Sequence, residues 1–196
     1  MDNANKRIAR NTIYMYVRLL STMVIGLYIS RLALSILGVS DYGLYAVVGG
    51  VLAVFTFISG SLASATSRFF NIEMGKPNGD VNASFNINLT LHICFAIIVM
   101  LLAETIGLWY VYNHLNVADN KLDDAVFVYH ISMFTVGLGI INTPYQSLLT
   151  AHEQFRFMAI VDIANSLLRL ACILLLTLAP ANHLRFYSII FALTTI

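Results

Sequence analysis

Charged side chains are scarce in this 196-residue chain. Asp, Glu, Lys and Arg make up 11% of it, whereas 59% of the residues are hydrophobic and the mean hydropathy is +0.78. None of these four residue types occurs at positions 42–67, 81–103 or 125–151. Such values lie well outside the range of soluble globular domains. The composition therefore indicates a membrane protein, and we expect no nucleic-acid partner.

Residues arranged for metal, phosphate or nucleophile chemistry are equally few. The two cysteines, Cys94 and Cys172, lie deep in apolar runs without metal-ligand spacing, so we interpret them as small hydrophobic residues. The sequence has no metal-binding motif, no glycine-rich phosphate loop and no nucleophile elbow. It also has no paired acid and base at a plausible catalytic spacing. We expect no cofactor, no metal site and no enzyme activity.

The apolar runs predict an all-α fold. Five segments are long enough to cross a hydrocarbon core of about 30 Å as helices. A sixth apolar run, from Pro180 to Ile196, is too short to reach the far side. We therefore predict one domain over residues 1–196, a polytopic transmembrane helix bundle of five complete helices plus a partial sixth. The complete helices are predicted near residues 8–37, 43–70, 84–112, 125–150 and 156–179.

The distribution of basic residues predicts the orientation. Lys6, Arg7 and Arg10 precede the first span and resemble the start of a signal peptide, but the run that follows is too long and has no small-residue cleavage site. By the positive-inside rule they place the N-terminus in the cytoplasm. Residues 68–80 and 152–156 then also lie inside, where basic residues outnumber those of the external segments.

Polar residues inside the predicted spans are candidates for function. Arg18 lies about a third to halfway along the first span, where a charge is costly unless it faces the bundle interior or water. Asn11, Tyr14, Arg18, Ser21 and Tyr28 follow helical spacing, and the fifth span repeats this pattern with a second series: Asp162, Asn165, Arg169 and Cys172. Each of these helices is thus expected to have one polar face.

A structural interpretation of these charges remains open beside the functional one. Arg18 and Arg169 can each be neutralised by an acid on a facing helix, Asp162 or Glu104. Asp162 and Arg169 are seven residues apart, about 10 Å along one helix, which is too far for a direct ion pair. Their partners are therefore expected on other helices, in solvent or in a substrate.

The segment "RLALSILGVSDYGLY", residues 31–45, separates the first two apolar runs. Gly38 can end the first helix in a left-handed conformation, and Ser40 or Asp41 can cap the second. Arg31 and the tyrosines suit the membrane interface.

At this point the sequence resembles a known family. An arginine in the first span, "SRLALSILGVSDYGLYAVVGG" at residues 30–50 and "SGSLASATSRFF" at residues 59–70 are similar to the N-terminal part of the polysaccharide biosynthesis (O-antigen and teichoic-acid export) flippases. These belong to the superfamily of multidrug, oligosaccharidyl-lipid and polysaccharide exporters. The similarity is strongest over residues 11–75; beyond them, hydropathy and the helix count agree.

The resemblance implies one lobe of a two-lobed transporter in the bacterial inner membrane. Such a protein moves an undecaprenyl-diphosphate-linked oligosaccharide across the membrane by alternating access. The resemblance therefore implies three kinds of partner: this lipid-linked substrate, membrane lipids, and a C-terminal lobe or second copy. The last is expected because 196 residues correspond to about one lobe. Residue by residue, Arg18 and Arg68 match substrate-binding arginines and Asp41 the acid of the "LGVSDYGLY" hinge. That hinge includes Gly38 and Gly43. Arg169 matches no family motif. We include it among the candidate substrate-binding arginines because it lies within the predicted fifth span.

Rival functions remain. A multidrug exporter of the same superfamily favours a cavity with net acid, a membrane enzyme needs a catalytic cluster, and a scaffold leaves the buried charges unexplained. Glu104 and Asp162 are candidates for ion pairing or for coupling to an ion gradient.

Overall fold

The computed structural model describes residues 2–115, 117, 121–177 and 182–195, with the backbone alone at residues 2–4, 51 and 54–58. These residues are 92% helical and include no strand. The all-α prediction is therefore confirmed for the described part of the chain. The predicted end of the fifth helix at Ala179 lies outside the described residues.

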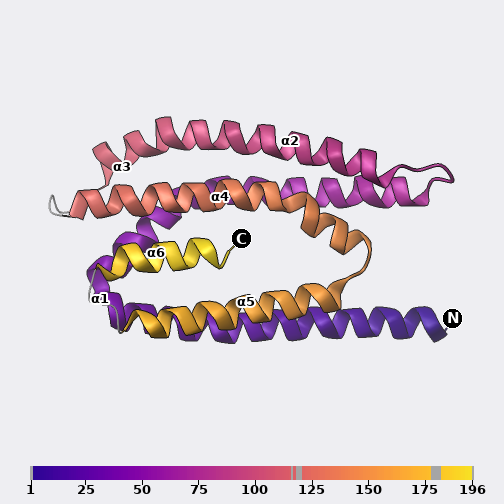
Figure 1. The fold of residues 1–196 in the computed structure, drawn as a ribbon, viewed down its shortest axis with the longest axis horizontal. Coiled ribbons are helices and arrows are strands. Elements are labelled where there is room, and N and C mark those ends of the chain that lie inside the picture. Colours follow the sequence, from indigo (N-terminus) through magenta and orange to yellow (C-terminus); the bar gives the residue numbers. More distant parts are fainter. Residues whose placement is uncertain (1, 116, 118–120, 178–181, 196) are drawn as a thin grey trace.

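Helix α1, Asp2–Gly75, contains the first two predicted helices. Its backbone is helical except at Gly38, where φ is 76° and ψ is 170°. This conformation is essentially restricted to glycine because a Cβ atom would collide with the backbone. Figure 1 shows the result: α1 turns back at this point, so that it forms a first limb (residues 2–37) and a second limb (residues 39–75).

The remaining helices follow the predicted order. The segment from Val81 to His114 is helical throughout, and the elements after α1 are α2 (Val81–Leu102), η1 (Ala103–Gly107), α3 (Leu108–His114), α4 (Leu122–Ala151), α5 (Phe155–Leu176) and α6 (His183–Leu193). Four helical stretches of the described chain are long and apolar enough to cross a membrane, namely Asn5–Gly50, Val81–His114, Leu122–Ala151 and Phe155–Leu176. This supports a membrane protein.

The predicted count of five complete helices differs from this result. The first two predicted helices are present as the two limbs of α1, but they count as one element because only Gly38 separates them and the apolar stretch of α1 runs across it. The partial sixth helix is present as α6, which has 11 residues.

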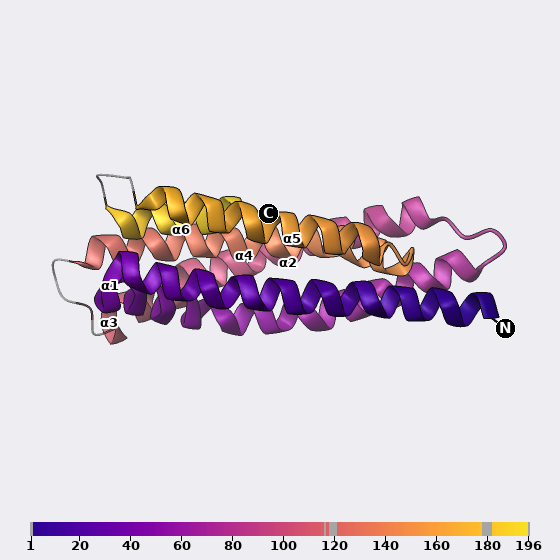
Figure 2. The ribbon, with the colours of Figure 1, turned by 90° about the horizontal axis from the view of Figure 1, so that it is seen from below.

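The helices form two layers with α6 between them. The first limb of α1 lies along α5, and the second limb lies with α2 and α4 (Figure 1). Figure 2 shows the same pairing of α5 with the first limb from another direction. Pro144 lies within α4, whose last turns bend toward the start of α5.

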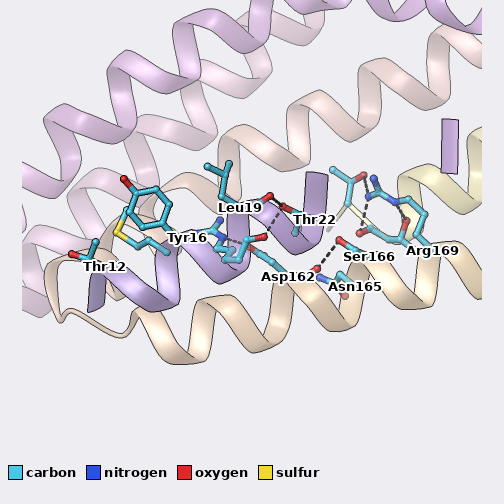
Figure 3. A pocket seen from close by; sticks show the side chains of 12 residues that line it. Thr12, Tyr16, Leu19, Thr22, Asp162, Asn165, Ser166 and Arg169 are labelled. Atoms are coloured by element: carbon cyan, nitrogen blue, oxygen red, sulfur yellow. Dashed lines mark hydrogen bonds and ion pairs between the residues drawn. The ribbon is translucent and has the colours of Figure 1, made fainter. Parts of the chain in front are cut away.

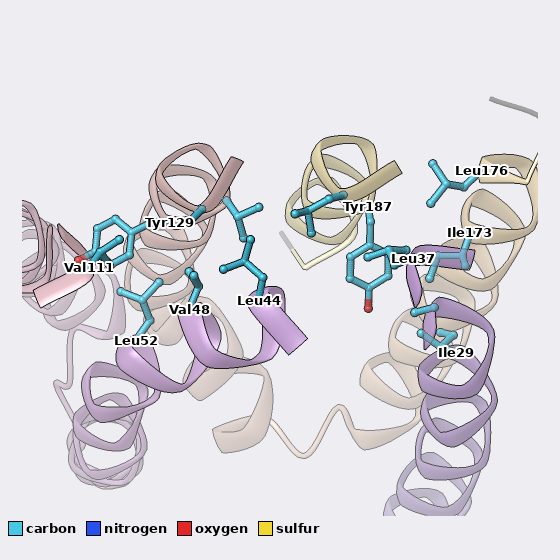
Figure 4. Packing of buried hydrophobic residues seen from close by; sticks show 14 of the residues in the cluster. Ile29, Leu37, Leu44, Val48, Leu52, Val111, Tyr129, Ile173, Leu176 and Tyr187 are labelled. Atoms are coloured by element: carbon cyan, nitrogen blue, oxygen red, sulfur yellow. The ribbon is translucent and has the colours of Figure 1, made fainter. Parts of the chain in front are cut away.

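The core lies near Gly38. Buried residues at intervals of four line both limbs of α1, first Ile29, Ala33 and Leu37, then Leu44, Val48 and Leu52. They pack against side chains of α4, α5 and α6, as Figure 4 shows. The fold-back thus buries both limbs of one helix in one cluster.

A close contact joins η1 to α4. The Tyr129 hydroxyl donates a hydrogen bond of 2.6 Å to the carbonyl oxygen of Ala103, the first residue of the π-helical turn η1. A Cβ atom at Gly107 would lie 2.0 Å from the same hydroxyl oxygen. Gly107 therefore provides the space that the tyrosine occupies.

Gly38→Ala is expected to destabilise the protein by about 1–3 kcal/mol, because alanine cannot easily adopt the backbone conformation of Gly38. Gly43→Ala is the matched control. A Cβ atom there meets nothing within 4 Å, and the residue lies within helical backbone, so alanine is expected to be neutral or slightly stabilising. Thermal unfolding of both variants in detergent measures the difference. Equal stability of the two variants would contradict the role assigned to Gly38.

Candidate functional site

The first limb of α1, α5 and the two residues that follow α6 line an open cavity of about 660 Å³. Both membrane arginines highlighted by the sequence line it. In Figure 3, Asp162, Asn165, Ser166 and Arg169 of α5 lie opposite the side chains of α1. The full lining comprises Thr12, Met15, Tyr16, Arg18, Leu19, Thr22, Asp162, Asn165, Ser166, Arg169, Thr194 and Thr195.

Arg18 forms an ion pair with Asp162 across the α1–α5 interface. The Arg18 Nε atom contacts Asp162 Oδ2, and each side chain is 32% exposed. Both groups are half-buried, so each would carry a substantial desolvation cost without the other. One of the two partnerships that the sequence left open for Arg18 is therefore present.

Arg169 has a different environment. Its Nε donates to Thr194 Oγ1 at 2.8 Å, and its Nη2 donates to the Thr194 carbonyl at 3.1 Å and to Thr195 Oγ1 at 2.8 Å. The guanidinium carbon lies 4.1 Å from the centre of the Phe191 ring. Among the described residues, no carboxylate lies within ion-pair distance of Arg169, and its Nη1 makes no hydrogen bond.

The cavity wall consequently has an unbalanced positive charge. Two arginines and one aspartate line it, and Asp162 is already paired with Arg18. Arg169 is held by neutral hydroxyl and carbonyl oxygens, which orient the guanidinium without neutralising it. A guanidinium with free N–H groups binds phosphate or carboxylate oxygens. The chemistry of this cavity therefore favours an anionic ligand.

The polar face predicted for the first helix is displaced by one residue. Arg18 lines the cavity, but its companions there are Thr12, Tyr16 and Thr22, not the predicted stripe that begins at Asn11 and Tyr14. On α5, the predicted residues Asp162, Asn165 and Arg169 do line the cavity.

Two other predicted residues lie elsewhere. Arg68 is exposed near the end of α1 and does not line this cavity. Glu104 lies in η1, and its Oε1 is 3.2 Å from His130 Nε2, so its contact is with a histidine of α4 and not with either arginine. Asp162 is the predicted acid that meets an arginine.

The predicted hinge residues cluster at the turn of α1. Gly38 supplies the reversal, and one turn later the Asp41 carboxylate contacts Lys121 Nζ at the start of α4. Lys121 also donates to Ser40 Oγ at 3.0 Å. Gly43 lies within helical backbone, and a Cβ atom there would be tolerated. Asp41 and Ser40 are thus bonded to another helix.

Sequence reasoning missed three residues: Thr194, Thr195 and Lys121. The adjacent threonines at the end of an apolar run are a polar signal that marks them as candidates. Lys121 gives no such signal, because its pairing with Asp41 joins residues 80 positions apart.

No family model, curated protein or solved structure matches the chain. Within the described part of the chain, no group of three or more His, Cys, Asp or Glu residues could hold a metal ion.

Arg18→Ala is expected to lower the free energy of unfolding by about 1–3 kcal/mol, because Asp162 would remain half-buried without its partner. Arg18→Ala/Asp162→Ala is expected to recover part of this loss. Thermal unfolding of the wild type, both single variants and the double variant completes the cycle. Strictly additive losses would mean that the two side chains do not interact.

The Asp41→Asn substitution distinguishes between two roles of Asp41, namely helix capping and ion pairing with Lys121. Asparagine caps helices about as well as aspartate, so a cap predicts little change. Loss of the pairing instead predicts a destabilisation of about 1 kcal/mol that disappears in a Lys121→Gln background. Thermal unfolding in the wild-type and Lys121→Gln backgrounds measures this coupling. If Asp41→Asn leaves the stability unchanged in both backgrounds, the pairing is refuted.

Proposed function

We propose that this chain is one lobe of a bacterial inner-membrane transporter that exports an undecaprenyl-diphosphate-linked oligosaccharide for cell-surface polysaccharide synthesis. The observation that most supports the proposal is Arg169, a cavity-lining guanidinium without a carboxylate partner among the described residues. The sequence resemblance over residues 11–75 supplies the transporter class. The proposed N-terminus is cytoplasmic.

The mechanism follows from the charge of the ligand. A diphosphate crossing an apolar medium requires cationic partners and polar surroundings, because an unpaired anion is very costly there. In the proposal, the diphosphate binds Arg169 first, at the Nη1 group that has no hydrogen-bond partner among the described residues, and also draws Arg18 from Asp162. The ligand would thus exchange an internal ion pair for a protein–phosphate pair.

Alternating access needs two lobes that move about a shared site. We propose that a C-terminal lobe or a second copy supplies the opposite wall of the cavity. Thr194 and Thr195 link Arg169 to the end of α6, so displacement of this end would reposition the arginine. Movement of α6 is thereby connected to ligand binding.

A multidrug exporter is the second candidate. It would bind cations and would therefore need net acid in the cavity, whereas the lining has two arginines and one aspartate. Glu104, the second membrane acid, contacts His130 away from this cavity. The charge balance therefore favours an anionic substrate over a cationic drug. A scaffold or a membrane enzyme receives no comparable support.

Binding of undecaprenyl diphosphate to the purified full chain tests the proposal. Arg169→Ala is expected to weaken binding by about tenfold to a hundredfold, because it removes a charged hydrogen-bond donor from the phosphate. Arg169→Lys is expected to lie between this variant and the wild type, since lysine keeps the charge without the forked geometry. Undecaprenol, which lacks the diphosphate, provides the neutral comparison.

Arg185→Ala is the matched control variant. Arg185 also lies beside an aromatic ring, 5.1 Å from Phe127, but its Nε bonds Asp124 Oδ1 at 2.6 Å and it is not part of the cavity lining. The Arg185→Ala variant should bind undecaprenyl diphosphate with the same affinity as the wild type. Equal weakening by the Arg169 and Arg185 variants, or equal binding of undecaprenol and its diphosphate, would refute the proposal.

A further inference from the structure

A second, more polar pocket lies where the first limb of α1 meets the turn between α4 and α5. Its volume is about 500 Å³. Arg7 and Arg10 of α1 line it together with His152 and Arg156 from the region of the turn. Basic side chains therefore converge on this pocket from two parts of the sequence about 140 residues apart.

Glu153 is the single carboxylate among the described residues that line the pocket, and it is already engaged. Glu153 Oε2 lies 3.2 Å from Arg7 Nε and also accepts a 2.9 Å hydrogen bond from Asn11 Nδ2. Arg10 and Arg156 are exposed, and no described carboxylate lies within ion-pair distance of either. Two guanidinium groups are thus available to an external anion.

The turn between α4 and α5, which carries His152 and Glu153, has a defined backbone conformation. Glu153 has a φ of 55°, a left-handed conformation that is uncommon for a residue other than glycine. Backbone hydrogen bonds from His152 to Leu148 and from Gln154 to Leu149, of 3.0 and 2.9 Å, fix the turn. It is followed directly by α5, whose N-terminal end adds a field of the same positive sign.

The same two helices expose apolar side chains one turn further into the predicted membrane spans than the basic residues. Ile13 follows Arg10 by one helical turn, and Ile160 follows Arg156 by one turn, and both are exposed. The pocket thus lies next to surface that suits acyl chains. A free phosphate ion would use the basic residues alone, whereas a phospholipid would use both features.

We propose that this pocket binds the phosphate of an anionic phospholipid headgroup, with Arg10 and Arg156 as its main ligands. Arg10 lies eight residues from Arg18, about 12 Å along α1, so the site is separate from the cavity of the proposed transport substrate. The inference does not rest on the proposed function, because any membrane supplies such a lipid.

Native mass spectrometry of the full chain in neutral detergent tests the site by counting the lipids retained from added phosphatidylglycerol or phosphatidylcholine. The wild type is expected to retain phosphatidylglycerol in preference to phosphatidylcholine. Arg156→Gln is expected to weaken the binding of phosphatidylglycerol about fivefold, the effect of one basic residue near an anionic surface. Arg31→Gln is the control, since Arg31 is exposed, lines neither pocket and has no ion-pair partner in the described residues.

Glu153→Gln provides a variant with the opposite expected effect. It removes the competing carboxylate and frees Arg7, so it should increase phosphatidylglycerol retention, which a poorly folded variant would not do. Equal retention of the two lipids by the wild type, or equal losses in Arg156→Gln and Arg31→Gln, would overturn the site. Displacement of phosphatidylglycerol by an equal concentration of inorganic phosphate would overturn the assignment to a lipid.

Discussion

The backbone turn at Gly38 decides which surfaces of this chain face one another. A continuous α1 would place its two limbs end to end, about 110 Å long for 74 residues, and would bring no two parts of it together. The turn instead allows Ile29 of the first limb and Leu52 of the second limb to join one core. It also directs the first limb along α5, where Arg18 meets Asp162. Both the core and the candidate site thus depend on one residue without a side chain.

The two arginines of the cavity, Arg18 on α1 and Arg169 on α5, are held in two distinct ways. Arg18 has an internal acid, so it is neutralised in the ligand-free protein. Arg169 is oriented by Thr194 and Thr195 but keeps its charge. A cavity with one arginine paired to a carboxylate and one held, among the described residues, by neutral oxygens can attract an anion and still avoid two uncompensated charges within the membrane. In the proposed function, this division of roles lets one cavity combine ligand binding with stability.

Hydropathy predicted the helical segments well because apolar length is a local property. For Arg18 the sequence left open an acid on a facing helix, Asp162 or Glu104, or a substrate, since isolated charges are costly in a membrane, and the structure contains the pair with Asp162. The two helices predicted on either side of residues 38–42 correspond to the two limbs of α1, but only Gly38 separates them, because a glycine can reverse a helix without any loop. Thr194 carries a polar signal in the sequence, but its bond to Arg169 and the bond from Lys121 to Asp41 could not be predicted, because both depend on how distant helices pack.

The hydrogen bond from Tyr129 to Ala103 restricts how this bundle can deform. The tyrosine oxygen fits only where Gly107 leaves room, so it marks a single register of α2, η1 and α3 against α4. A slide of one helical turn, about 5.4 Å, would break the bond and leave the hydroxyl against side chains. The hydrogen bond therefore resists sliding of α2, η1 and α3 along α4. We expect sliding to meet less resistance between α5 and the first limb of α1, where the Arg18–Asp162 pair is a partly exposed polar contact.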